Sequence, residues 1–240
     1  GPQGLEFSGG LGSSRSGGYA EYTTAPSSGV YETNSVHSDA ELATLACAYM
    51  TAQNMLDTAQ VVSGETVLVT GASGGVGTAL VQLAHARGAK VIAVTSNKHL
   101  ASVQSLSPHG VVCRDSGDLI DQVLALADEG GVDVVADVVA GELFSNLLAC
   151  LKIKGRYVTA GAIGSPKVAF DVRTLYLKFL TFYGVSCGMP SHFEKVLELL
   201  EASSIKPLLH ATYSLSEFKQ AQTHFMGKDF FGNIVVLPGS

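Results

Sequence analysis

From residue 66 onward, short runs of apolar residues alternate with longer segments in which apolar residues recur at helical spacing. The short runs are rich in Val, Ile, Leu, Tyr and Thr, and they predict strands at residues 66–70, 91–95, 111–113, 132–137, 156–160 and 181–185. The segments between them predict helices at residues 75–87, 98–106, 119–127 and 143–151. Strands that alternate with helices in this way form a parallel sheet.

Two of the predicted strands are nearly continuous apolar runs. They are Val67-Leu68-Val69 and the segment 132–136. Such strands are buried on both faces of a sheet, because helices cover the two sides. The pattern therefore predicts an α/β fold, a doubly wound parallel sheet.

The segments on either side of this alternation have a different character. Residues 1–18 are mostly Gly and Ser and predict a flexible lead or a remnant of cloning. Residues 19–24 predict a short strand that stops at Pro26, and Ser38 with Asp39 predicts the start of a helix that runs to Leu56. Beyond the last predicted strand, we expect helices at 192–203 and 215–226, an extended segment at 207–213 and a strand at 233–237.

Composition narrows the class of protein. Apolar residues make up 46% of the 240 residues and charged residues 15%, which is typical of compact proteins. The net charge of −6 and the absence of basic clusters argue against nucleic acid as a partner, and no apolar run is long enough to span a membrane. The four cysteines form no CxxC pair, so a reducing, cytoplasmic location is expected.

The strongest local motif follows the first predicted strand. The sequence VLVTGASGGVG at residues 67–77 reads as a strand, a glycine turn and the start of a helix. Gly74 and Gly75 allow the backbone to approach a pyrophosphate, and Gly77 allows the helix to pack closely on the strand. Ala72 stands where a GxGxxG motif has its first glycine, but the strand–turn–helix context still favours a dinucleotide-binding Rossmann domain.

Two other interpretations of this turn remain open. Residues 71–75 also match G-x-S-x-G, the nucleophile elbow of α/β-hydrolases, in which Ser73 would be the nucleophile. The third glycine, Gly77, has no role in such an elbow, and the alternation of strands and helices begins at this strand. The turn could also be purely structural. Dinucleotide binding is preferred over both.

The same turn resembles the cofactor turn of the medium-chain dehydrogenases and reductases, the family of zinc-type alcohol dehydrogenases and quinone oxidoreductases. Further stretches resemble that family in the same order along the chain: 18–22 (GYAEY), 46–52 (ACAYMTA), 131–139 (GVDVVADVV), 155–162 (GRYVTAGA) and 231–236 (FGNIVV). The joint occurrence of these stretches is more specific than any one of them.

The resemblance implies a domain organisation. Members of the family have a GroES-like catalytic domain, then the Rossmann domain, then a return of the chain to the catalytic domain. Residues 19–37 resemble the end of the GroES-like part, 38–205 the Rossmann domain, and 206–240 the return segment. We therefore expect short remnants of a GroES-like domain, in either a fragment or a shortened relative that turns over substrates poorly by itself. Residues 19–24 and 208–213 would then expose strand edges or apolar faces, so we expect self-association into a homo-oligomer or docking onto a partner chain. The alternative is that these two segments pair with each other.

By resemblance, the cofactor-binding residues follow from the matching positions. Gly74, Gly75 and Val76 would meet the pyrophosphate, and Thr51 would lie near the nicotinamide carboxamide. Ser73, in the same turn, is also expected to be a cofactor-binding residue. The remaining positions would border the ribose, the nicotinamide and the phosphates; they are Val138, Val139, Gly161, Ala162, Ile163, Gly232 and Asn233. Packing at the strand ends and ordinary turns are the alternative roles of these residues.

The end of the second predicted strand bears on the choice of cofactor. A site specific for NAD(H) usually places Asp or Glu there, to bind the ribose hydroxyls. Here Ser96 and Asn97 leave room for a 2′-phosphate, and Lys98 can give it a charge-assisted hydrogen bond. The sequence therefore predicts NADP(H), although Lys98 could be only a solvated residue of a helix.

The implied reaction is hydride transfer between NADP(H) and a carbonyl, an enone or quinone, or an alcohol, with a small molecule as substrate. No catalytic residue follows from the sequence. Cys47 resembles a zinc ligand of the family, but one cysteine does not make a zinc site and no metal is expected. Tyr49 is a weak candidate proton donor on an apolar helix face and fits a core position better. A non-catalytic dinucleotide-binding protein is the alternative from another class.

Overall fold

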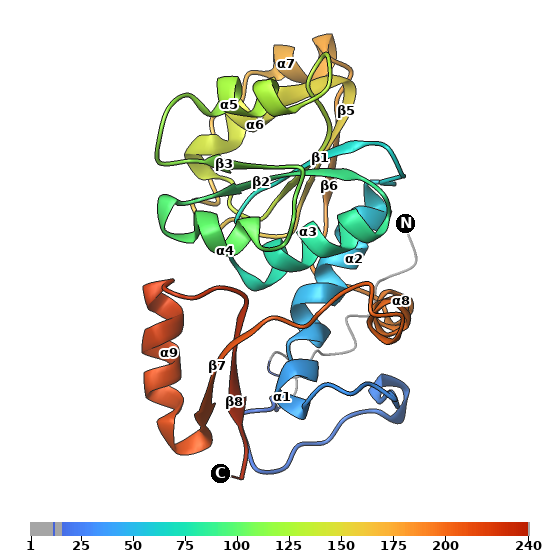
Figure 1. The fold of residues 1–240 in the computed structure, drawn as a ribbon, viewed down its shortest axis with the longest axis vertical. Helices are drawn as coiled ribbons and strands as arrows, with labels where there is room; N and C mark the ends of the chain where they lie inside the picture. The colour runs from blue at the N-terminus through green and yellow to red at the C-terminus, as the bar shows by residue number, and fades with distance from the viewer. Residues whose placement is uncertain (1–11, 13–15, 240) are drawn as a thin grey trace.

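The computed structural model describes residue 12 and residues 16–239. The flexible lead expected over residues 1–18 falls mostly outside these residues. The described chain forms an upper body around a six-stranded sheet and a lower unit around a two-stranded sheet (Figure 1).

The six strands of the upper body are all parallel and lie in the order β3-β2-β1-β4-β5-β6. This order is that of a Rossmann fold, so the predicted doubly wound sheet is confirmed. The predicted strands are all present, with bounds β1 Thr66–Val69, β2 Lys90–Thr95, β3 Gly110–Cys113, β4 Val132–Asp137, β5 Leu151–Thr159 and β6 Thr181–Gly184.

Helices cover both faces of this sheet, and alternate residues of each strand face opposite sides. Val67 and Val69 of β1 belong to one apolar cluster, and Leu68 between them belongs to the other. The first cluster includes residues of α2 (Met50–Thr58), α3 (Gly75–Ala86), α4 (Leu100–Gln104) and α8 (Pro190–Glu201). The second is built with α5 (Leu119–Leu126), α6 (Phe144–Cys150) and one residue of α7 (Val172–Leu177).

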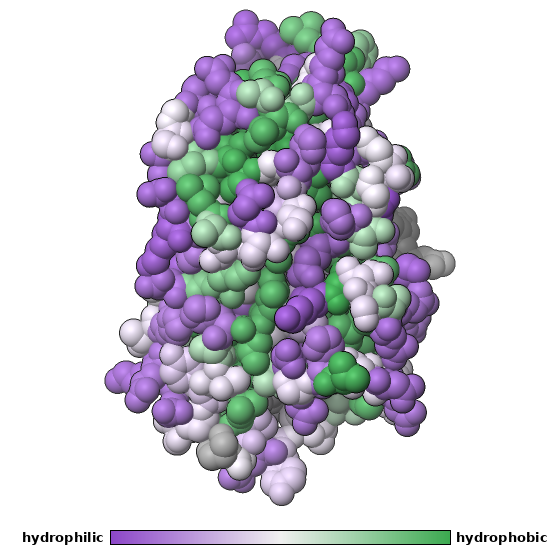
Figure 2. Space-filling model, viewed as in Figure 1, coloured by the Kyte–Doolittle hydropathy of each residue, from purple (hydrophilic) through white to green (hydrophobic). Residues whose placement is uncertain are grey.

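The lower unit consists of β7 (Leu209–Ser214), α9 (Phe218–Gly227) and β8 (Asn233–Leu237), with β7 and β8 parallel. All five residues of β8 are only half-buried, and hydrophobic residues reach the surface over this region (Figure 2). The lower unit therefore does not enclose a core of its own. No helix in the described part of the chain is long and apolar enough to cross a membrane.

Three expectations need correction. The strand predicted at 19–24 does not form: β7 pairs with β8 instead, Tyr22 is 90% exposed, and the Tyr19 ring packs on Phe218 at 4.5 Å. A strand without a partner leaves its backbone groups to water, so the residue types alone do not make one.

The sequence also missed α7, which buries none of its own residues fully and therefore shows no clear apolar face.

The third correction concerns the helix expected from Ser38 to Leu56, which is divided into three pieces. Ser38 and Glu41 form a capping box at the start of α1 (Asp39–Leu42), so the predicted beginning is confirmed. A π-helical turn over Leu45–Tyr49 then joins α1 to α2. Such turns insert an extra residue and shift the faces of a helix.

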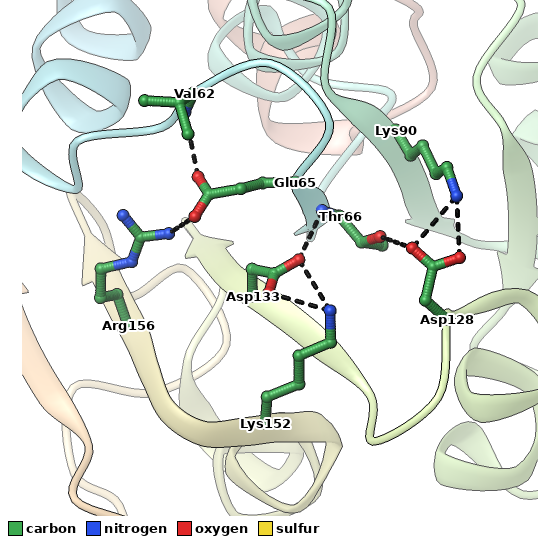
Figure 3. Close-up of polar contacts among 8 residues, drawn as sticks. All are labelled: Val62, Glu65, Thr66, Lys90, Asp128, Asp133, Lys152 and Arg156. Atoms are coloured by element: carbon green, nitrogen blue, oxygen red, sulfur yellow. Dashed lines mark hydrogen bonds and ion pairs between the residues drawn. The ribbon is translucent and has the colours of Figure 1, made fainter.

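The amino ends of the strands carry a set of paired charges, here called the amino edge (Figure 3). Lys152 contacts Asp133 at 2.9 Å, Lys90 contacts Asp128 at 2.8 Å, and Arg156 pairs with Glu65. Two of these carboxylates also accept hydrogen bonds from Thr66, which begins β1. The charged groups at this edge thus pair with one another and with the strand backbone.

Candidate functional site

The main cleft lies at the carboxyl ends of the strands, between the sheet and the lower unit. Its volume is about 1110 Å³, and it is lined by the turns after β1, β2, β3 and β4 and by the segment that joins α9 to β8. Ligands of open α/β sheets bind at this edge, where the strand order reverses between β1 and β4. The location fits the dinucleotide cleft expected from the sequence.

The glycine turn (residues 71–77) has the local geometry that a pyrophosphate requires. Gly74 is the N-cap of α3 and provides no side chain to cap the first amide groups of the helix. A Cβ on Gly74 would meet only the Gly71 carbonyl oxygen, at 3.6 Å, so this backbone faces the open cleft. A Cβ on Gly77 would lie 2.0 Å from the same oxygen. Gly77 therefore lets α3 pack on the turn, and Gly74 leaves room for an anion at the helix N-terminus.

The return segment holds the glycine turn from the other side. The Gly232 amide donates to the Ser73 carbonyl at 2.9 Å, and Gly74 and Gly232 form an isolated parallel bridge. The side-chain oxygen of Asn233 lies 2.3 Å from where a Cβ on Gly75 would be. A side chain at position 75 would thus clash with the return segment. The glycine turn and the return segment are far apart in the sequence but lie against each other in the fold.

A buried carboxylate organises the loop after β4. Asp137 is fully buried, and its carboxylate accepts hydrogen bonds from the hydroxyls of Thr70 and Tyr157 and from the amides of Val139 and Ala140. Burial and the charge of Asp137 raise the pKa of Tyr157, so its hydroxyl keeps its proton and donates. The loop that carries Val138 and Val139 into the cleft is fixed by this network.

Sequence reasoning did not identify Asp137 or Tyr157. The available signal was an acidic residue at the end of an apolar strand. A carboxylate in that position is buried, and a buried carboxylate needs several hydrogen-bond donors around it. Tyr157 could not be linked to it from the sequence, since the two residues lie on neighbouring strands. Both residues position the loop, and neither lines the cleft.

Cationic side chains gather at the end of the cleft formed by β2, β3 and the α9–β8 segment. Lys98, Arg114 and Lys228 line it, and no Asp or Glu does so among the described residues. Lys98 pairs with Asp229 at 2.5 Å, and this ion pair holds the pKa of Asp229 below its ordinary value. Sequence reasoning named Lys98 but missed Arg114 and Lys228, which come from separate segments.

The structure brings most of the predicted cofactor residues together and leaves three outside the cleft lining. Those that line it are Ser73, Gly74, Gly75, Val76, Ser96, Lys98, Val138, Val139, Gly161, Ile163, Gly232 and Asn233. Thr51 is only 5% exposed inside the packing of α2. The Asn97 amide donates to Asp115 at 2.7 Å, and Ala162 faces a smaller neighbouring hollow.

Three candidates for catalytic or metal chemistry have ordinary surroundings. Tyr49 is fully buried, and its hydroxyl donates to the Lys206 carbonyl at 2.6 Å, which confirms its core position. Ser73 is hydrogen-bonded to no histidine or carboxylate in the described chain, so no base is placed to activate it. Cys47 is exposed on the cleft wall, and no group of three or more His, Cys, Asp and Glu residues in the described part could hold a metal ion. The surroundings of Cys47 in the described part of the chain therefore do not fit a catalytic zinc, which needs three protein ligands.

Comparison with known proteins agrees with this fold. The family model of the zinc-binding dehydrogenases matches residues 75–202. Quinone oxidoreductase from Rattus norvegicus is 31% identical over 233 residues, which cover 92% of this chain and 70% of that protein. The chain therefore belongs to the zinc-binding dehydrogenases, a branch of the medium-chain dehydrogenase/reductase family of oxidoreductases.

Solved structures place it in the same class. A candidate alcohol dehydrogenase from Sinorhizobium meliloti 1021 is 47% identical with a TM-score of 0.92, and the match covers 95% of this chain and 63% of that one. An NAD-dependent alcohol dehydrogenase is 26% identical with a TM-score of 0.91, covering 95% of this chain and 67% of that one. The chain thus spans about two thirds of the length of its relatives.

Proposed function

We propose that this chain binds a nicotinamide dinucleotide, NADP(H), across its main cleft and holds it for hydride transfer to or from a small molecule. The single observation that carries the proposal is the open backbone at Gly74, next to uncapped amide groups at the start of a 12-residue helix and at the reversal of strand order. This arrangement is a dinucleotide pyrophosphate site.

Each part of the cleft has a role in holding the cofactor. The amides of Gly75 and Val76 bind the pyrophosphate, and Gly232 and Asn233 close the turn from the side of the return segment. Val138 and Val139 pack against the ribose, on a loop that Asp137 keeps in place. Gly161 and Ile163 border the nicotinamide ring. When bound, the cofactor supplies the hydride chemistry, while the chain orients the ring and excludes water.

The preference for NADP(H) rests on charge. No carboxylate lines the described cleft, so the usual acidic partner of the NAD(H) ribose hydroxyls is not placed there. Three cations line the same end, which favours an additional phosphate. One structural relative is named an NAD-dependent alcohol dehydrogenase, so the affinities of this chain for NADP(H) and NAD(H) need to be compared directly.

The hydride acceptor or donor is proposed to be a carbonyl, an enone or quinone, or an alcohol; the relatives' names cover the quinone and the alcohol. The expected location is cytoplasmic. A non-catalytic binding role would predict cofactor affinity with no turnover. Steady-state NADPH oxidation across a panel of quinones, enones and aldehydes distinguishes these two functions.

Titration of NADPH by its fluorescence tests the binding proposal. The Gly74→Val variant should lose cofactor affinity by at least 10-fold, because the side chain fills the space for the pyrophosphate. Gly29→Val is the matched control, since nothing lies within 4 Å of a Cβ at that position and it is not part of the cleft. NADPH binding at wild-type affinity by Gly74→Val would refute the pyrophosphate assignment.

A further inference from the structure

The α9–β8 segment, residues 228–232, forms part of the wall of the main cleft. Lys228, Phe230 and Gly232 of this segment line the cleft. The Gly232 amide also donates to the Ser73 carbonyl in the glycine turn, at 2.9 Å. The position of the α9–β8 segment therefore sets the shape of the cleft beside the glycine turn.

Two histidines of the lower unit hydrogen-bond to the backbone of this segment. The Nε2 atom of His224, on α9, lies 3.1 Å from the carbonyl oxygen of Asp229. The Phe231 amide donates to Nδ1 of His210, on β7, at 3.4 Å. The two imidazole rings lie edge to face, with their centres 5.4 Å apart. The backbone on both sides of Phe230 is thus held by imidazole groups that come from two separate elements.

A register shift in the two-stranded sheet gives His210 its place. The ladder pairs Leu209 with Asn233 and then Ala211 with Ile234, so β7 has one residue more than β8 at this point. His210 is that extra residue and has no partner in the ladder. A bulge of this kind re-aims a side chain. Here it lets the imidazole accept a backbone amide of the α9–β8 segment, where the strand itself offers no pairing residue.

The hydrogen bonds of the two histidines differ in their response to a proton. A backbone amide can only donate, so Nδ1 of His210 accepts only while it carries no hydrogen, and a proton there would break the bond. In His224, Nε2 carries the hydrogen because a carbonyl can only accept, and Nδ1 faces the Tyr213 hydroxyl at 2.8 Å. A hydroxyl can accept as well as donate. Protonation therefore spares the contacts of His224 and removes that of His210.

The surroundings do not compensate a positive charge on His210. The other titratable groups around the two histidines come from β7, the α9–β8 segment and the loop after β2; they are Tyr213, Lys228, Asp229, Lys98 and His99. Asp229, the one carboxylate among them, pairs with Lys98 at 2.5 Å. Helix α1 and the turn after β7 also pack on this sheet and carry Asp39, Glu41 and Glu217, of which the two glutamates bind serine caps. His210 itself is exposed, so a proton from solvent can reach it.

We propose that His210 is a positioning residue of the dinucleotide site: in its neutral form it holds the α9–β8 segment in place beside the glycine turn, and its protonation releases the segment and weakens dinucleotide binding. This inference rests on the proposed dinucleotide-binding function. Because histidine changes its charge between about pH 5 and 8, affinity should be full above this range and should fall as the pH drops through it. The lower unit thereby makes cofactor affinity dependent on pH.

The experiment measures dissociation constants of NADP⁺, which is stable in acid, by isothermal titration calorimetry on the full chain at about pH 7.5 and about pH 5.5. The 2′-phosphate of the ligand titrates near pH 6 itself, so each variant is compared with the wild type at the same pH. His210→Gln should bind as the wild type does at the higher pH, because the glutamine oxygen can accept the Phe231 amide. At the lower pH it should bind about 3-fold or more tighter than the wild type, since it keeps a hydrogen bond that the protonated histidine loses.

A second variant tests the same contact without a change of pH. His210→Leu can neither accept the Phe231 amide nor take up a proton, so its dissociation constant at the higher pH should rise about 3-fold or more. The matched control is His109→Gln, because His109 is exposed and lies outside the cleft lining. This control should follow the wild type at both pH values. Circular dichroism recorded on each sample separates a loss of affinity from a loss of fold.

The outcomes separate the two proposals. If the wild-type chain binds neither NADP⁺ nor NADPH at the higher pH, the proposed function itself fails. If it binds, but wild type and His210→Gln lose affinity in parallel on acidification, or neither loses it, the dinucleotide site stands and the role of His210 is overturned. Wild-type affinity in His210→Leu at the higher pH overturns it as well. A pH dependence that is smaller in His210→Gln and unchanged in His109→Gln supports it.

Discussion

The two edges of the six-stranded sheet use charged groups in opposite ways. At the amino edge, Asp133, Asp128 and Glu65 each pair with a cation and bind backbone or hydroxyl groups nearby (Figure 3). At the carboxyl edge no carboxylate faces the described cleft, and the cations there exceed their acidic partners. The amino edge is saturated by its own side chains, whereas the carboxyl edge retains donors that a ligand can use.

The Asp137 carboxylate lies behind the carboxyl edge and does not line the described cleft. Asp137 is fully buried, and every interaction it makes is with a hydroxyl or an amide donor. Ion pairs that are partly exposed, such as those of the amino edge, contribute at most about 1 kcal/mol each. We therefore expect the carboxyl edge to be sensitive to single substitutions and the amino edge to tolerate them.

The largest effect is expected for Asp137→Asn, which should lower the free energy of unfolding by roughly 2–3 kcal/mol, because an amide turns an NH₂ group toward donors and leaves some of them unsatisfied. Denaturant unfolding measures it. The matched control is Asp171→Asn at the exposed N-cap of α7, where asparagine caps as well as aspartate and the change should be small. Equal losses in the two variants would contradict the special role of Asp137.

The next effect concerns the glycine turn. Gly77→Ala should cost on the order of 1–3 kcal/mol of stability and also reduce NADPH affinity, because the new Cβ would lie 2.0 Å from a carbonyl oxygen and would force α3 away from the turn. Gly74→Ala should reduce affinity while keeping its thermal stability, since that position is open. A stable Gly77→Ala protein with normal affinity would show that the close packing is unnecessary.

A smaller effect is expected at the amino edge. Asp133→Asn removes the ion pair to Lys152 but keeps an oxygen for the Thr66 amide, so the free energy of unfolding should fall by about 1 kcal/mol or less. Affinity for NADPH should not change, because the site lies at the opposite ends of the strands. A loss of affinity in this variant would mean that the two edges are coupled.

The smallest effect is expected for the ion pair between Lys98 and Asp229, which joins the upper body to the lower unit. Lys98 lowers the pKa of Asp229 in the folded chain, so this contact stabilises the fold above about pH 4 and is lost as the pH falls through the lowered pKa. Thermal unfolding of wild-type and Asp229→Asn protein should differ slightly at pH 6 and converge toward pH 3. The difference should also shrink in 1 M NaCl, which screens exposed pairs. A difference independent of pH and salt would have another cause.

Local sequence determined most of the fold. Apolar runs of strand length, helical spacing between them and the glycine turn predicted the parallel sheet and its six strands, because these features depend on residues close in the chain. The same locality explains the errors. Residues 19–24 have strand-like side chains but no neighbouring strand, and α7 is too exposed to show an apolar face.

The tertiary structure decided which charged groups are available at the site. Lys98 was a reasonable phosphate ligand from the sequence alone, but folding places Asp229 against it. Arg114 and Lys228 meet at the cleft from β3 and from the return segment, and no periodicity links them. Contacts between residues far apart in the chain depend on how the elements pack, so the composition of the proposed cofactor site could be read only from the folded chain.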